Sequence, residues 1–156
     1  MEVRLRAPEA DGVQVTKIYR FRRASYLIEV AFEIVNRSAA AIDPWAYFHL
    51  VRNSKPPAAD SAMLPTFTGF AVYTEKDKFQ KITFEEVDKG KAALPKESKD
   101  GWIAILQHYF LGSWVPKNGV ERAFYIDRTN GDYRAGLKVP TGSIGPGAAA
   151  TVAVPL

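Results

Sequence analysis

Residues 13–35 read VQVTKIYRFRRASYLIEVAFEIV, and this stretch decides the fold. Apolar side chains fall on odd positions in its first half and on even positions in its second half. The odd set is Val13, Val15, Tyr19 and Phe21, and the even set is Tyr26, Ile28, Val30, Phe32 and Ile34. Alternation with a period of two is typical of strands that bury one face. The stretch therefore predicts two strands that share an apolar inner face.

A turn at Ala24-Ser25 would join these strands into an antiparallel hairpin with a defined register. Opposite charges that face each other across such a ladder stabilise it by roughly 0.2–1 kcal/mol, and a slip of one residue would turn both apolar sets outward. Lys17 falls on the inner face, so we expect the ladder to bend or fray there. The predicted pairs are Phe21 with Ile28, Tyr19 with Val30 and, on the other face, Arg20 with Glu29.

A second hairpin is predicted around Asn130-Gly131. This dipeptide is a strong hairpin signal because both central turn positions need positive φ. Closing the chain there sets apolar residues against each other on one face and opposite charges on the other. The predicted pairs are Phe124 with Leu137, Ile126 with Ala135 and, on the outer side, Asp127 with Arg134.

The remaining chain also favours strands. Residues 101–115 are almost continuously apolar, and their aromatic content with punctuating glycines favours a pair of strands over a short helix. Trp45 is the tryptophan most expected to be exposed. We expect further strands at 42–51, 67–74, 78–87 and 151–156, and exposed loops at 54–65 and 88–100. The prediction is an all-β, antiparallel β-sandwich that forms a single domain over residues 1–156.

Composition excludes several functions. The formal charge of +4 comes from 21 basic and 17 acidic residues that are spread along the chain, which argues against nucleic-acid binding. There is no cysteine, so disulfides and thiolate metal sites are excluded, and no apolar run approaches the ~20 residues that span a bilayer. His49 and His108 have no acidic or histidine neighbour at metal-ligand spacing, so we interpret both as half-buried structural residues. We predict no catalytic residues, no cofactor and no metal.

One long motif resembles a known family. It consists of Gly101-Trp102, Leu106-Gln107, Tyr109-Phe110 and Trp114-Val115-Pro116 in this order. This order is similar to that in the large periplasmic domain of the YidC membrane-protein insertases, and the resemblance extends over nearly the whole chain. It implies a β-supersandwich like that of galactose mutarotases, of which this chain would be the C-terminal portion.

The resemblance also implies a role. YidC proteins insert and fold proteins in the bacterial inner membrane, and the insertion work belongs to a transmembrane core that these residues do not include. The domain would lie at the periplasmic face of the inner membrane as part of a multi-pass protein. Its expected partners are Sec translocon accessory subunits, the insertase core and client membrane proteins. We therefore expect a non-catalytic domain that assists insertion by docking.

The best candidate docking surface lies within residues 72–91, where aromatic and charged residues are mixed as protein interfaces favour. Two alternatives stay open: a carbohydrate-binding or mutarotase-like domain, for which His108 with a converging carboxylate would be needed, and a surface that holds emerging client loops. The predicted protein-binding residues are Tyr73, Lys76, Lys78, Phe79, Lys81 and Phe84.

Overall fold

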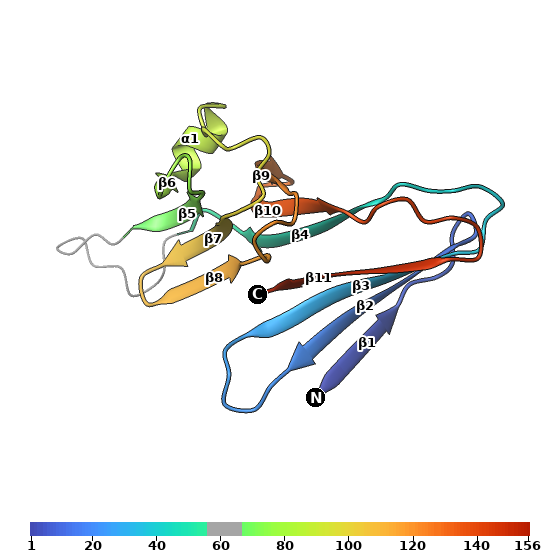
Figure 1. Cartoon of the computed structure of the whole chain (residues 1–156). Coiled ribbons are helices and arrows are strands. Elements are labelled where there is room, and N and C mark those ends of the chain that lie inside the picture. The colour runs from blue at the N-terminus through green and yellow to red at the C-terminus, as the bar shows by residue number, and fades with distance from the viewer. Residues whose placement is uncertain (56–66) are drawn as a thin grey trace. The chain divides into compact units, whose positions relative to one another are not determined.

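The computed structural model describes residues 1–55 and 67–156 and confirms an all-β, antiparallel fold (Figure 1). Most of the loop predicted at 54–65 lies outside the described residues. The strands are β1 (Glu2–Arg6), β2 (Val13–Phe21), β3 (Ile28–Asn36), β4 (Trp45–Arg52), β5 (Thr68–Tyr73), β6 (Gln80–Ile82), β7 (Trp102–Gln107), β8 (Phe110–Trp114), β9 (Ala123–Thr129), β10 (Asp132–Pro140) and β11 (Ala149–Pro155), and the described part of the chain has one helix, α1 (Phe84–Asp88).

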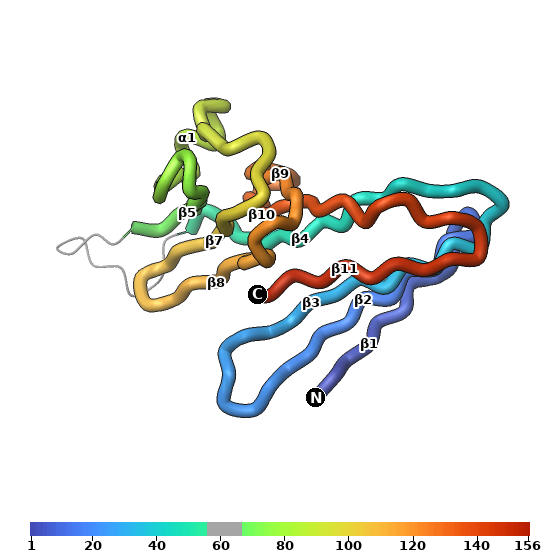
Figure 2. Tube along the Cα trace, viewed as in Figure 1, coloured from blue at the N-terminus to red at the C-terminus, as the bar shows by residue number. Residues whose placement is uncertain are grey.

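The chain divides into two compact units. The first comprises Met1–Ala46 and Val139–Leu156, and the second comprises Tyr47–Lys138. The first unit contains a four-stranded antiparallel sheet in the order β1-β2-β3-β11. Figure 2 shows the path of the chain through the β2–β3 hairpin. The residue pairing of β2 with β3 confirms the register predicted from residues 13–35. Phe21 pairs with Ile28, Tyr19 with Val30 and Arg20 with Glu29.

The expectation that this ladder frays at Lys17 is wrong. Pairing between β2 and β3 runs without interruption, and Lys17 lies opposite Phe32. The Lys17 ammonium lies 5.0 Å from the ring centroid of Tyr19 and 5.5 Å from that of Phe32. A cation over aromatic faces is attracted by their quadrupoles, so the lysine fits an otherwise apolar face without breaking the pairing.

The predicted inner face of this sheet is only partly buried. Val30 and Ile34 on β3 are buried, but the odd residues of β2 are half-exposed and Tyr26 is fully exposed in the turn. On β2 the buried residues are the even ones, including Ile18. Arg4 on β1 donates to Glu33 on β3 at 2.9 Å, so its side chain must cross over β2. Long charged side chains thus cover the smaller residues of the face predicted to be outer.

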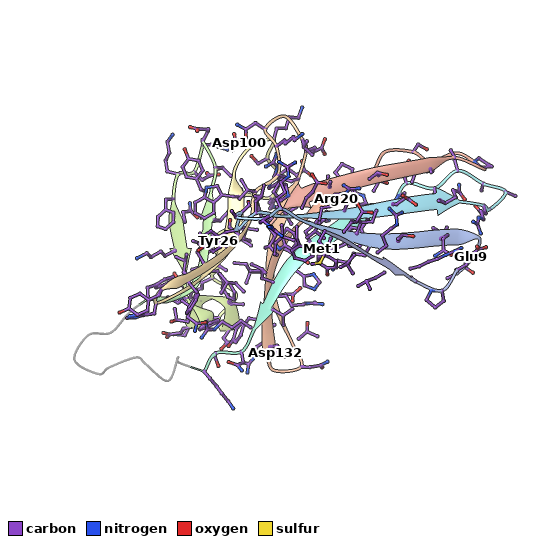
Figure 3. All side chains as sticks on the ribbon, turned by 90° about the horizontal axis from the view of Figure 1, so that it is seen from below. Met1, Glu9, Arg20, Tyr26, Asp100 and Asp132 are labelled. Carbon is purple, nitrogen blue, oxygen red and sulfur yellow. The ribbon has the colours of Figure 1, made fainter. Side chains whose placement is uncertain are left out.

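That charged face carries a continuous network of ion pairs. Glu2 accepts from Arg4 at 3.2 Å and from Arg20 at 2.8 Å, and Arg20 also pairs with Glu29. Figure 3 labels Arg20 among the side chains. The two arginines hold the pKa of Glu2 below its usual value, with the hydrogen bond from Arg20 the larger cause. The network joins three neighbouring strands through side chains as well as through the backbone ladder.

The second unit is a sandwich of two sheets, one in the order β4-β10-β9 and the other in the order β6-β5-β7-β8. Aromatic rings pack between them: Phe48 lies 5.3 Å from Trp114, and Phe70 lies 6.3 Å from Tyr133. Residues 101–115 form the β7–β8 hairpin, which confirms strands over a helix. The β9–β10 hairpin also has its predicted register: Phe124 pairs with Leu137, Ile126 with Ala135 and Asp127 with Arg134.

The strand predicted at 78–87 is wrong over most of its length. Only Gln80–Ile82 is a strand, and α1 follows at once. Thr83 caps this helix: its hydroxyl accepts from the Glu86 backbone N–H at 3.2 Å, while the Glu86 carboxylate accepts from the Thr83 N–H at 2.7 Å. This reciprocal capping box satisfies two backbone donors that a helix start would otherwise leave unpaired.

Candidate functional site

Two of the six predicted docking residues meet on one aromatic surface. The rings of Tyr73 and Trp102 are stacked with centroids 6.1 Å apart, and the ring of Phe79 lies 6.0 Å from Trp102. Phe79 is 50% exposed, while the other two are half-buried. We call these three residues the aromatic patch. Its centre, Trp102, was not among the predicted binding residues because it reaches Tyr73 only through the pairing of β5 with β7.

Charged residues border the aromatic patch. Glu75 accepts a hydrogen bond from the Tyr73 hydroxyl at 3.0 Å, and it pairs with the Lys78 ammonium at 3.3 Å. The hydrogen bond to Glu75 raises the pKa of Tyr73. Lys76 is exposed in the same turn between β5 and β6. The aromatic patch, with its fixed tyrosine and projecting phenylalanine, thus has two exposed lysines at its border.

The other two predicted residues lie elsewhere. Lys81 is exposed on β6, and its ammonium lies 4.9 Å from the ring centroid of Phe67. The ring of Phe84 lies 5.3 Å from Phe70 and 4.7 Å from Tyr133, and the side chains of both of these residues are buried. Phe84 therefore packs α1 onto the sandwich, and it does not take part in the aromatic patch.

A glycine allows the strands under the aromatic patch to meet. Gly101 precedes β7 with φ +86°, and a Cβ there would lie 1.9 Å from the carbonyl oxygen of Tyr73. Only a residue without a side chain permits both this backbone conformation and this approach. The Gly-Trp pair of the sequence motif therefore has a structural reason: the glycine lets Trp102 lie opposite Tyr73.

Arg122 holds the loops on either side of β7 and β8. It is fully buried, and burial lowers its pKa. Its side chain makes charge-assisted hydrogen bonds to backbone oxygens, among them Gly101 O at 2.8 Å and Pro116 O at 3.1 Å. Sequence reasoning gave no signal for it, because the spacing of a single arginine does not show which carbonyls it will meet. The accepting residues are Lys99, Gly101, Pro116, Lys117 and Val120.

A polar cleft lies on the outer face of the β4-β10-β9 sheet. Its lining is Tyr47, His49, Tyr125, Asp127, Arg134 and Lys138. His49 Nδ1 lies 2.7 Å from the Tyr125 hydroxyl, and Arg134 donates two hydrogen bonds to Asp127 at 2.7 and 2.9 Å. Burial, with the nearby Asp127 charge, raises the pKa of Tyr125 to about 12. His49 is exposed, which corrects the expectation that it is half-buried.

His108 lies in the turn between β7 and β8 and is half-buried, as predicted. Its ring meets the ring of Tyr109 edge-on at a centroid distance of 3.7 Å. The hollow that it lines, with residues that include Lys81 and Leu111, is not lined by any described carboxylate. The acid–base pair that a mutarotase-like reaction needs is therefore not formed around this histidine in the described part of the chain. Within residues 1–55 and 67–156 there is also no group of three candidate metal ligands, and no helix there has the length and apolarity needed to cross a membrane.

Comparison with solved structures agrees with the fold. A galactose mutarotase related enzyme from Lactobacillus acidophilus superposes with a TM-score of 0.59 over 99% of this chain and 66% of its own, at 10% identity. Identity this low shows a shared fold alone. The predicted likeness to galactose mutarotases in fold is confirmed.

Comparison of sequences shows the family. The family model of the YidC periplasmic domain matches residues 1–156. A membrane protein insertase YidC from Nitrosospira multiformis is 54% identical over 100% of this chain and 28% of its own length, and one from Nitrosomonas europaea is 49% identical over 98% and 25%. The chain thus spans about a quarter of the length of these relatives. Both relatives are named as insertases and not as sugar-converting enzymes. The chain belongs to the family of YidC periplasmic domains.

Proposed function

We propose that this domain assists membrane-protein insertion at the periplasmic face of the inner membrane by docking to another protein. Its partners would be Sec translocon accessory subunits or the transmembrane core of the insertase. The observation that carries the proposal is the aromatic patch, where Phe79 projects beside Trp102 and two exposed lysines. Aromatic anchors on a rigid sheet, with charges at the rim, are the usual composition of a protein-binding surface.

The rigidity of the aromatic patch favours binding. Tyr73 is fixed by its hydrogen bond to Glu75 and by stacking on Trp102, so little side-chain freedom remains to be lost on association. Lys76 and Lys78 would meet an acidic partner surface, and they would raise the association rate more than the affinity. We therefore expect binding that weakens with salt and depends chiefly on Phe79.

A binding assay with purified partners tests the proposal. The double variant Phe79→Ser/Lys78→Glu should weaken binding to the true partner at least about tenfold, as for the loss of one buried aromatic anchor. The control Leu5→Ser/Lys96→Glu makes the same kinds of change at exposed positions elsewhere and should leave binding unchanged. Equal binding of both variants to every Sec accessory subunit and to the insertase core would overturn the proposal.

The polar cleft supports a second candidate, carbohydrate binding. Two tyrosines, Tyr47 and Tyr125, meet there with ring centroids 5.9 Å apart, beside the charged pair Asp127–Arg134. Aromatic faces with fixed polar groups suit a sugar. Isothermal titration with common hexoses, repeated on Tyr47→Ala, tests it: heat that disappears in the variant supports carbohydrate binding, and an absence of heat with the unmodified chain rules out these hexoses as ligands.

A further inference from the structure

The turn between β7 and β8 exposes three consecutive large apolar side chains. Tyr109 is 85% exposed, Phe110 74% and Leu111 64%. Figure 1 shows β7 and β8 as a hairpin whose turn lies at one end of the sheet. Exposed apolar residues are ordinary when they are scattered singly, but a contiguous group marks an interaction site. We call these three residues the hairpin tip.

The hairpin tip is apolar on both faces of its strands. Phe110 lies on the same face of β8 as Gly112 and Trp114. It lines one hollow together with Leu50 and Ile105. Leu111 points to the opposite face and, with Phe67 and Leu106, lines a second hollow, whose lining also includes Tyr109 and Phe110 at the end of the hairpin. Tyr109 extends the end of the hairpin. A flat protein surface could cover one of these faces, whereas a medium that surrounds the tip covers all of them.

Basic side chains lie behind the hairpin tip on both faces. Arg52 lines the first hollow and hydrogen-bonds to Gln107, the last residue of β7. Lys81 lines the second hollow, and the described lining of both hollows contains no carboxylate. Gln107 pairs with Phe110 and Leu106 with Leu111, so Arg52 lies beside the last strand pairs and Tyr109 in the turn projects beyond them. A long basic side chain at this level can extend back to the headgroups. Interfacial segments bury their apolar side roughly 5–10 Å deep, with basic groups at the level of the headgroups.

From this arrangement we propose that the hairpin tip inserts into the surface of a phospholipid bilayer with anionic headgroups. Tyr109, Phe110 and Leu111 enter the boundary of the acyl region, and Arg52 and Lys81 contact the phosphates. The kinship with membrane protein insertases places such a bilayer within reach, because a membrane protein is inserted at a bilayer. This site is separate from the aromatic patch and does not depend on the docking proposed above.

The absence of cysteine makes a site-specific test simple. A Tyr109→Cys variant carries one environment-sensitive fluorophore at the hairpin tip, and Asn118→Cys carries the same label at an exposed turn beyond the opposite end of β8. Both are mixed with vesicles of phosphatidylethanolamine and phosphatidylglycerol, and with vesicles of phosphatidylcholine alone. We expect a blue shift and quenching by spin-labelled lipids only for the label at 109, and stronger binding to the anionic vesicles that weakens with salt.

Sedimentation with the same vesicles tests the side chains themselves. Phe110→Ser/Leu111→Ser should lower the partition coefficient by at least about tenfold, because each apolar side chain contributes roughly a factor of ten. Val3→Ser/Leu5→Ser removes two exposed apolar side chains from β1 and should have little effect. Circular dichroism verifies that both variants are folded. The proposal would be overturned if the two variants partitioned equally. It would also be overturned if the blue shift at position 109 appeared without lipid and increased with protein concentration, because the label would then report contact with a second copy of the chain.

Discussion

Replacing Gly101, and comparing the result with Gly119, distinguishes the cost of a steric clash from the cost of a positive φ. Gly101→Ala should destabilise the chain by about 3 kcal/mol or more, because its Cβ would meet the Tyr73 carbonyl oxygen and its φ is positive. Gly119→Ala is the matched control: its φ is +87°, but nothing lies within 4 Å of the added Cβ. We expect a cost of only about 1 kcal/mol there. Urea unfolding of both variants measures the difference, and equal costs would contradict the steric explanation.

Arg122 allows a second prediction at this scale. Replacing it by methionine keeps much of its volume but leaves the carbonyls of Gly101, Pro116 and Val120 without their charged donor. We expect the free energy of unfolding to fall by about 3 kcal/mol or more. Each unsatisfied buried acceptor costs about 1–3 kcal/mol, and some of these carbonyls would accept a hydrogen bond from water instead. Arg122→Lys should recover only part of this, because one ammonium has three donors and lacks the planar fork. A lysine variant as stable as the unmodified chain would contradict this explanation.

At the scale of elements, the capping box predicts how α1 depends on Thr83. Thr83→Ala removes the hydroxyl that accepts from the Glu86 N–H and should destabilise the second unit by about 1 kcal/mol. Thr83→Ser keeps the hydroxyl and should be close to neutral. Chemical-denaturant unfolding that reports on Trp102 measures both changes. A serine variant as unstable as the alanine variant would show that the threonine methyl group matters more than the cap.

The strands could be predicted from sequence where a turn fixed the register. Both hairpins satisfied two conditions at once, apolar pairs on one face and opposite charges on the other, as Arg20 with Glu29 shows. The helix was missed because Phe79, Ile82 and Phe84 suggested alternation, although Thr83 and Glu86 have the spacing of a capping box. That signal was available in the sequence.

The candidate site was harder to predict than the hairpins. Trp102 joins Tyr73 by pairing between strands that are separated by about thirty residues, and no local pattern encodes such a pairing. Phe84 was placed on the surface because a strand was assumed, whereas the helix turns it toward Tyr133. Burial on β2 also escaped prediction, because it depends on Arg4 reaching across from β1. The periodicity of apolar residues does not show which distant strands pair or how far long side chains reach.

At the scale of the whole molecule, each unit carries a group whose shifted pKa makes its stability depend on pH. The pKa of Glu2 in the first unit is lower in the folded state than in the unfolded state. Ionised Glu2 therefore stabilises the fold above the usual pKa of a glutamate, and this stabilisation is lost as the pH falls through the lowered folded-state pKa. The folded-state pKa of Tyr125 in the second unit is raised to about 12, so its contribution is present below about 10 and is lost as the pH rises toward 12.

The melting temperature followed from acid to alkaline pH should therefore fall on both sides, for different reasons in the two units. In Glu2→Gln the melting temperature should fall less steeply at acid pH and should be unchanged in its alkaline decline. Glutamine is uncharged, so there is no carboxylate whose protonation could weaken the ion pairs. Tyr125→Phe should flatten the decline above pH 10, and Tyr26→Phe, at a fully exposed position, serves as its control. Tryptophan fluorescence measures all four chains. If Tyr125→Phe left the alkaline decline as steep as before, ionisation of this buried hydroxyl could not be its cause, and other groups would have to set that limit.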